Sequence, residues 1–502
     1  MFKNLLIVSL ILVSVIIVLR TLTLSVRSDN LRPCRSSDAD FIPASDTVLS
    51  RFQQALRFRT VSIEPFNYNR EELKKFNNFI NEAFPLLHSS SFIKHEVIGN
   101  FSRLYTVRGT NTSLTPYMLC SHLDVVPAEP SRWDVDPFGG EIRGDYIYGR
   151  GTIDDKHGVM GILEAMEFLL SKGFQPQRSF YIAFGHDEEV NGADGARVIS
   201  ETLYQRGVRR LEFLLDEGLT VTQGIFPGTD TPVALIGTSE KGYINVQLKV
   251  KGEVGHSSMP KKETAITVLA RAISKLEGHP HPSMFGYGPE LDMFQHMASK
   301  LKPLHRAVMS NLWLFSPLVS WMLSWKPETN AIVKTVTSVT MVHGGVKINV
   351  LPPEAVAMVN HRVHPAQTVK EVVDYDRRLI NDDRVEVTVL DSMEPLPMSP
   401  YGDEDFGYQT IKNSIQQIWT TAAVTPGVMI GNTDTKHYTR FTENIYRFSP
   451  SFMHPNDLKR FHGDNERISI KNYEQAINFF YHVIINANEE KLLPYHKHGE
   501  EL

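Results

Sequence analysis

Three apolar segments in the first half of this chain each end in acidic or imidazole side chains, and this pattern constrains the fold most. The segments span residues 117–121, 179–185 and 211–215, and the polar groups after them begin at His122, His186 and Asp216. Short apolar runs that alternate with amphipathic segments are typical of strands buried on both faces of a parallel or mixed sheet. Ligand sites of open α/β sheets lie at the carboxyl ends of such strands. We therefore predict an α/β fold with a polar site at that edge.

The pattern changes near residue 242 and changes back near residue 393. Between these points the order is strand, helix, two strands, helix and strand, which is the ferredoxin-like order. At 502 residues the chain also exceeds one ordinary core. We predict a discontinuous α/β domain, 45–241 and 393–490, interrupted by a smaller α+β domain, 242–392, that carries an apolar insertion at 280–329.

Composition excludes some classes of protein. Hydrophobic residues make up 42% of the chain and charged residues 22%, as in an ordinary globular protein. The net charge of −5 implies no basic face, so we expect no nucleic-acid partner. The two cysteines, Cys34 and Cys120, exclude a disulfide framework, although a single bridge between them stays open.

The N-terminus predicts entry into the secretory pathway. The apolar run 5–19 is long for the core of a signal peptide and short for a membrane span, so residues 1–26 are a signal peptide or a signal anchor. A polar linker, 27–44, follows. Sequons at Asn100 and Asn111 fit a secreted, extracellular glycoprotein, and a membrane-anchored protein is the alternative.

The polar groups at the predicted strand ends have the composition of a metal site. His122 and Asp124 are two residues apart, so on a strand they share a face. Alone, each acidic group could be a helix cap and each histidine a satisfied core residue. Together, neighbouring carboxylates repel unless a cation neutralises them, and two divalent ions that share a bridging carboxylate would do so. The groups are His122, Asp124, Asp154, Asp155, Glu188, Glu189, Asp216 and His462.

Short motifs surround these residues. They read SHLDVVP at His122, GRGTIDDK at Asp154, GHDEE at Glu188, DEG at Asp216, GHSS at His256 and HGDNE at His462. With these motifs the chain resembles, over residues 45–487, the co-catalytic di-zinc amidohydrolases and peptidases related to aminoacylase, carnosinase and glutamate carboxypeptidase.

The resemblance implies a zinc-peptidase catalytic domain on a mixed sheet, a ferredoxin-like lid and dimerisation domain, and two Zn²⁺ per subunit. Asp154 would bridge the ions, His122 and Asp216 would complete one, and Glu189 and His462 the other. Asp124 would orient His122, and Glu188 would be the general base on a metal-bridging water. The family also implies a cis bond between Asp154 and Asp155. Adjacency alone does not separate Glu188 from Glu189 as the ligand.

Further residues match positions of the family outside the metal site. His256 would reach over from a partner subunit of a homodimer and stabilise the oxyanion, or it is a histidine in a surface turn. Five others match positions that hold the substrate and its carboxylate: Asn349, Arg362, Gly431, Asn432 and Thr433.

The apolar insertion bears on the substrate. It could form core or a dimer contact, touch a lipoprotein or a membrane surface, or wall a channel for an acyl chain. Within the family the chain resembles members that cleave and re-form the amide of N-fatty-acyl amino acids. We predict that small-molecule reaction, with fatty acid and amino acid as substrates in reverse. The alternatives are a dipeptidase or carboxypeptidase, and a metal-free binding protein with a decayed site.

Overall fold

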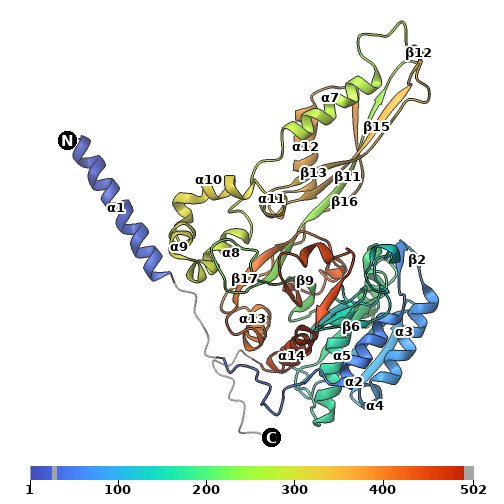
Figure 1. The fold of residues 1–502 in the computed structure, drawn as a ribbon, viewed down its shortest axis with the longest axis vertical. Helices are drawn as coiled ribbons and strands as arrows, with labels where there is room; N and C mark the ends of the chain where they lie inside the picture. Colours follow the sequence, from blue (N-terminus) through green and yellow to red (C-terminus); the bar gives the residue numbers. More distant parts are fainter. Residues whose placement is uncertain (1, 25–30, 491–502) are drawn as a thin grey trace.

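A computed structural model describes residues 2–24 and 31–490 (Figure 1). A larger α/β body lies at the bottom of the view, a smaller domain projects from its top, and the N-terminal helix α1 (Phe2–Thr23) stands apart on the left. The predicted signal segment and linker fall partly outside the described residues. Cys34 and Cys120 are both free.

The body is built on an eight-stranded mixed sheet with the order β17-β10-β18-β9-β5-β8-β4-β3. Neighbours β5, β8 and β9 are parallel, so their carboxyl ends meet at one edge as predicted. The strand pairs β10–β18 and β3–β4 are antiparallel. The strands are β3 (Ile93–Ile98), β4 (Ser102–Val107), β5 (Tyr117–His122), β8 (Phe180–Gly185), β9 (Leu214–Thr222), β10 (Val233–Glu240), β17 (Ala423–Met429) and β18 (Ile445–Met453).

Helices cover both faces of this sheet, which explains why its central strands are apolar without alternation. The main core joins one face to α2 (Asp46–Arg57), α3 (Arg70–Ala83), α4 (Pro85–Ser89), α5 (Lys156–Ser171), α13 (Phe406–Ile418) and α14 (Ile470–Ala487). Within it, Phe52 stacks on Tyr473 with ring centroids 4.1 Å apart. The opposite face packs on α6 (Ala196–Gln205) through residues such as Ile199 and Leu203.

The smaller domain has the predicted ferredoxin-like arrangement. Its antiparallel sheet has the order β13-β15-β11-β16. Residues of β11 are alternately buried, and Ile244, Val246 and Leu248 form a core with α7 and α12. The elements are β11 (Gly242–Lys251), α7 (Ala265–Gly278), β13 (Val336–Gly344), β15 (Glu354–Val363), α12 (Val369–Ile380) and β16 (Val385–Met393), with β12 (Gly255–His256) and β14 (Val350–Leu351) paired at the tip.

The apolar insertion forms four helices: α8 (Glu290–Met297), α9 (Pro303–Met309), α10 (Leu312–Leu323) and α11 (Pro327–Val333). Although the insertion interrupts the smaller domain in sequence, its buried residues pack on the body. Met293, Phe294 and Leu312 form a cluster with Val233 of β10. The insertion therefore packs against the β17–β10 end of the eight-stranded sheet.

Several short strands were not predicted from the sequence. They are the hairpin β1 (Ser62–Glu64) and β2 (Asn67–Tyr68), and the three-stranded sheet of β6 (Glu141–Arg143), β7 (Tyr146–Tyr148) and β19 (Arg467–Ser469). Strand β10 was also missed, and β9 runs on through the acidic motif that we expected to end it.

Candidate metal centre

His122 ends β5, a strand whose every residue is buried. Its Nε2 lies 2.9 Å from Oδ1 of Asp154, and its Nδ1 lies 3.0 Å from the main-chain oxygen of Asp124. The Asp124 carboxylate accepts hydrogen bonds from the main-chain N–H groups of Glu188, at 3.1 Å, and Glu189, at 3.3 Å. Asp124 therefore holds the ends of β5 and β8 together behind the His122 ring.

Asp154 lies at the centre of the site. Its second carboxylate oxygen is 2.9 Å from Nε2 of His462, and the same nitrogen is 3.2 Å from Oε2 of Glu189. Atoms of His122, Asp154 and Glu189 lie close enough together to share one ion, and Glu188 is not in that group. The bond between Asp154 and Asp155 is cis, as the resemblance implied.

Glu466 holds the loop that carries Asp154. This fully buried carboxylate accepts from Arg150 Nη1 at 2.7 Å, from the Ile153 N–H at 2.7 Å and from the Gly151 N–H at 3.1 Å. From the sequence Glu466 is only the end of the HGDNE motif, and it was given no role. Its place in that motif, four residues after His462, was the one available signal.

The Asp216-Glu217 pair lies on β9 beside His122. Oε1 of Glu217 is 3.4 Å from His122 Nε2, and His122, Asp155 and Glu217 form a second group that could hold an ion. Oδ1 of Asp216 accepts from the N–H of Glu217 at 2.9 Å. Asp216 stays the predicted ligand, and Glu217 is a candidate that the sequence reading missed.

The carboxylates in this site outnumber the imidazoles that could neutralise their charge. Burial, followed by the charge of a neighbouring carboxylate, raises the pKa of Glu188 and raises that of Glu189 to about 7. Burial raises the pKa of Asp216 to about 6. At Asp154, burial acts to raise the pKa, but the imidazoles of His122 and His462 outweigh it and hold the pKa below its usual range.

The donor set fits divalent cations. Oε1 of Glu189 and Oδ2 of Asp216 are buried and have no hydrogen-bond partner among the described residues. Buried acceptors without donors are costly, and a cation among them would satisfy both the lone pairs and the repulsion. Imidazole nitrogens and carboxylate oxygens are ligands of zinc in hydrolytic sites.

A second group of predicted residues meets where the two domains join. Arg362, on β15, donates from Nη1 to Oδ1 of Asn432. Asn432 Nδ2 donates to Oε1 of the buried Glu240 at 3.1 Å, and Thr433 Oγ1 donates to the other oxygen at 2.9 Å. Gly431, half-buried, precedes them. The loop 431–433 and Arg362 are thus brought together.

His256 and Asn349 lie elsewhere. Both are exposed, and they sit on or beside the β12–β14 pair at the far tip of the smaller domain, away from the body (Figure 1). His256 Nδ1 contacts the hydroxyl of Ser258, and the Ser257 N–H donates to the Asn349 oxygen at 3.2 Å. One chain in this conformation does not bring these two residues to the metal centre.

Comparisons with known proteins identify the family of this chain. Residues 118–486 match the model of Peptidase family M20/M25/M40, so the chain belongs to that family. It is 48% identical over 448 residues to N-fatty-acyl-amino acid synthase/hydrolase PM20D1 of Xenopus tropicalis, covering 89% of this chain and 87% of that one. It is 42% identical over 460 residues to probable carboxypeptidase S-like 2 of Dictyostelium discoideum, with the same coverage of 89% and 87%.

Solved structures confirm the fold. The M20 family metallo-carboxypeptidase Sso-CP2 of Sulfolobus solfataricus matches with a TM-score of 0.64 at 16% identity, over 88% of this chain and 100% of that one. Human carnosine dipeptidase 1 matches with a TM-score of 0.59 at 14% identity, over 88% and 96%.

Proposed function

We propose that this chain is a zinc-dependent amidohydrolase that cleaves, and reversibly forms, the amide bond of N-fatty-acyl amino acids. The observation that carries the proposal is the position of Asp154, whose two oxygens each lie 2.9 Å from an imidazole, of His122 and of His462. A carboxylate between two imidazoles is what a bridged pair of divalent ions requires. The names of relatives up to 48% identical support the substrate class.

The residues gathered at the metal centre and around Arg362 each have a task in this reaction. Two zinc ions, held by His122, Asp154, Glu189, Asp216 and His462, would supply a Lewis acid and an activated water. Glu188 takes the proton of the attacking water and returns it to the leaving nitrogen. The planar fork of Arg362, with the 431–433 loop, receives the substrate carboxylate.

The test is a hydrolysis panel on the purified full chain with N-oleoyl-phenylalanine, N-acetyl-phenylalanine and Gly-Phe, each with and without a chelator. We expect chelator-sensitive turnover concentrated on the oleoyl substrate. Glu188→Gln should lower kcat by about 10²–10⁴-fold, because it removes the proton acceptor, with zinc content unchanged. The matched control is Glu64→Gln, a carboxylate on the exposed β1 hairpin.

Other outcomes select the alternatives. Turnover mainly of Gly-Phe would favour a dipeptidase or carboxypeptidase, the activity named for the Dictyostelium relative. A chain that neither turns over any substrate nor retains metal would be a binding protein with a decayed site.

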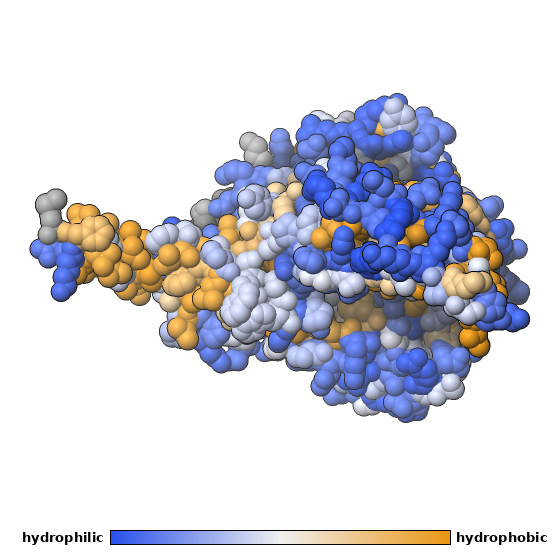
Figure 2. Space-filling view, turned by 90° about the horizontal axis from the view of Figure 1, so that it is seen from above, coloured by the Kyte–Doolittle hydropathy of each residue, from blue (hydrophilic) through white to orange (hydrophobic). Residues whose placement is uncertain are grey.

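The N-terminal helix and the insertion support a membrane location for this reaction. Helix α1 has 22 residues, is long and apolar enough to cross a bilayer, and is unburied. Figure 2 shows it as an apolar rod that projects from the body. Its end is held by the insertion: Arg306 Nε donates to the Thr21 oxygen at 2.8 Å, and Arg20 Nε donates to the Ser310 oxygen at 3.1 Å.

Helix α10 presents an apolar face next to this attachment. Trp321 of α10 is 59% exposed, Trp325 just beyond the end of the helix is 62% exposed, and Trp313, Leu318 and Met322 are exposed too. Exposed tryptophans are typical of the membrane interface. We therefore propose that α1 is a retained anchor, the alternative to the secreted form expected from the sequence, and that α10 touches the bilayer, where amphiphilic fatty-acyl substrates gather.

N-terminal sequencing of the protein made in a secretory cell tests the anchor. A chain that keeps residues 2–23 and resists extraction from membranes at alkaline pH supports it. A chain that begins beyond residue 23 and appears in the medium is the secreted enzyme, with α1 as a signal peptide. Asn100 and Asn111 are both exposed, so we also expect a glycosidase to increase its electrophoretic mobility.

A further inference from the structure

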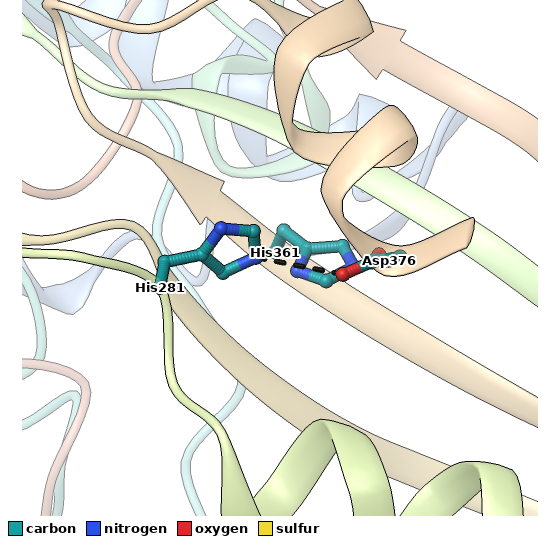
Figure 3. Close-up of side chains that lie close together, drawn as sticks. All are labelled: His281, His361 and Asp376. Carbon is teal, nitrogen blue, oxygen red and sulfur yellow. Dashed lines mark ion pairs between the residues drawn. The ribbon is translucent and has the colours of Figure 1, made fainter. Parts of the chain in front are cut away.

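A second cluster of metal-ligating side chains is buried in the smaller domain, outside the site described above. Figure 3 shows His281, from the loop that leads out of α7 into the insertion, His361 of β15 and Asp376 of α12 converging on one point. Their exposed fractions are 2%, 0% and 1%. His361 directly precedes the predicted substrate residue Arg362, but the sequence assigned no role to any of the three.

The polar atoms of this cluster lie close together but form no well-aligned hydrogen bonds with one another. Both ring nitrogens of His281, Nε2 of His361 and both carboxylate oxygens of Asp376 are buried without a hydrogen-bond partner in residues 31–490. The groups are close, since His361 Nε2 is 2.9 Å from Asp376 Oδ2 and His281 Nε2 is 3.5 Å from Asp376 Oδ1. Proximity without aligned hydrogen bonds, at a fully buried point, is unusual for a native core.

These nitrogen–oxygen separations are close to the distances between neighbouring ligand atoms of one metal ion. Zinc–nitrogen and zinc–oxygen bonds of about 2.0–2.2 Å place neighbouring ligands of a tetrahedral ion about 3.3 Å apart. One ligand atom from each of the three side chains lies within 4.8 Å of the others. The two imidazole nitrogens and one carboxylate oxygen would occupy three corners of the tetrahedron, and the second oxygen of Asp376 would be a fourth donor in a distorted position.

The surroundings orient the rings for this task. Thr337 Oγ1 lies 3.0 Å from Nδ1 of His361, which leaves Nε2 free to face the cluster. Such a hydrogen bond to the far nitrogen is the usual support of a metal-binding histidine. The ring of Tyr375 packs on His281 at 4.5 Å between centroids, and its hydroxyl donates to the main-chain oxygen of His279 at 3.3 Å.

We propose that His281, His361 and Asp376 bind a zinc ion in addition to those of the catalytic centre. The ion joins the first residues of the insertion to β15 and α12, so it fixes the base of the insertion to the smaller domain. Because the cluster is closed to solvent and all its donors come from the protein, the ion is structural and reacts with no substrate.

The test counts metal in the full chain purified without chelators. We expect the metal content, measured by plasma mass spectrometry, to fall by one ion per chain in His281→Gln and in Asp376→Asn. The control His279→Gln, an exposed histidine two positions earlier, should leave the count unchanged. In a separate variant that keeps His281 and Asp376 but carries His122→Asn and His462→Asn, one ion should remain, and Co²⁺ in its place should show a distorted tetrahedral visible spectrum.

The count in His281→Gln decides the outcome without reference to activity. An unchanged count, or an empty cluster in the catalytic double variant, overturns the proposal and leaves a metal-free histidine–aspartate cluster in its place. If His281→Gln does not fold, anomalous scattering at the zinc edge from crystals of the unsubstituted chain decides. A peak between His281 and Asp376 supports the ion, and its absence with peaks at the catalytic centre overturns it.

Discussion

Glu466, near the end of the chain, binds the loop around Arg150 and Asp154 through a buried ion pair and main-chain hydrogen bonds. It pairs with Arg150 at 2.7 Å inside the core and accepts main-chain hydrogen bonds from the loop of Asp154. Replacing one partner of a buried pair leaves the other charge unpaired. We expect Glu466→Gln to destabilise the chain by about 3–5 kcal/mol, measured by urea unfolding.

The same variant should weaken metal binding by about 10–100-fold, because the loop that positions Asp154 loses its support. Competition with a chelator dye measures this. The control is Glu96→Gln, whose partner Arg206 is at the surface, and there we expect a loss of at most about 1 kcal/mol. Equal effects of the two substitutions would refute the role given to Glu466.

At the scale of elements, Lys241 joins the body to the insertion. It lies between β10 and β11, fully buried, and Nζ donates to the main-chain oxygens of Ala331, at 2.8 Å, and Lys334, at 2.7 Å. Burial, followed by the charge of Arg362, lowers the pKa of Lys241 to about 7. A neutral amine has two hydrogens, which these two acceptors match.

This arrangement has a defined pH dependence. Between pH 7 and about 10.4 the unfolded chain holds a proton on Lys241 that the folded chain lacks, so this residue makes stability rise with pH. Lys241→Met should remove up to about 1.4 kcal/mol per pH unit from the slope of unfolding free energy in that window. Urea unfolding at four pH values measures it, and the exposed Lys251→Met should keep the wild-type slope.

The elements also show what sequence could predict. Strands β5 and β8 were predicted because burial on both faces leaves a local pattern of apolar residues, whereas the helices α8–α11 of the insertion were not predicted. Strand β10 was missed because Gly237, Thr238 and Ser239 interrupt its apolar run, and its burial comes from β17 and β9 beside it. Glu217, Glu466 and the His281 cluster were missed for a related reason: their partners are distant in sequence, and only the folded chain brings them together.

At the scale of the whole molecule, the tip of the smaller domain has the properties of a contact surface. His256 is exposed there, and the apolar side chains of Val254, Met259, Val346 and Ile348 around it are 65% to 102% exposed. Such an apolar patch is typical of an interface. The family resemblance implies that this histidine completes the site of a second subunit.

Mixing two inactive variants tests this. If His256 acts across subunits, His256→Ala and Glu188→Gln chains mixed at equal amounts and allowed to exchange should complete about a quarter of the sites, because each mixed dimer has one intact set. Turnover that rises on mixing is the expected result. If His256→Ala alone is fully active, or if mixing restores nothing, the histidine does not act in this way.

The position of β18 means that the sheet and the metal site are completed only late in synthesis. The strand lies between β9 and β10 although it follows both by more than two hundred residues, and His462 and Glu466 come shortly after it. During synthesis the sheet therefore waits, with its centre open, until almost the whole chain has left the ribosome. Contacts of such long separation form slowly and leave strand edges exposed meanwhile. We therefore expect the nascent chain to be exposed to aggregation until late in synthesis, and to bind its metal only after translation is nearly complete.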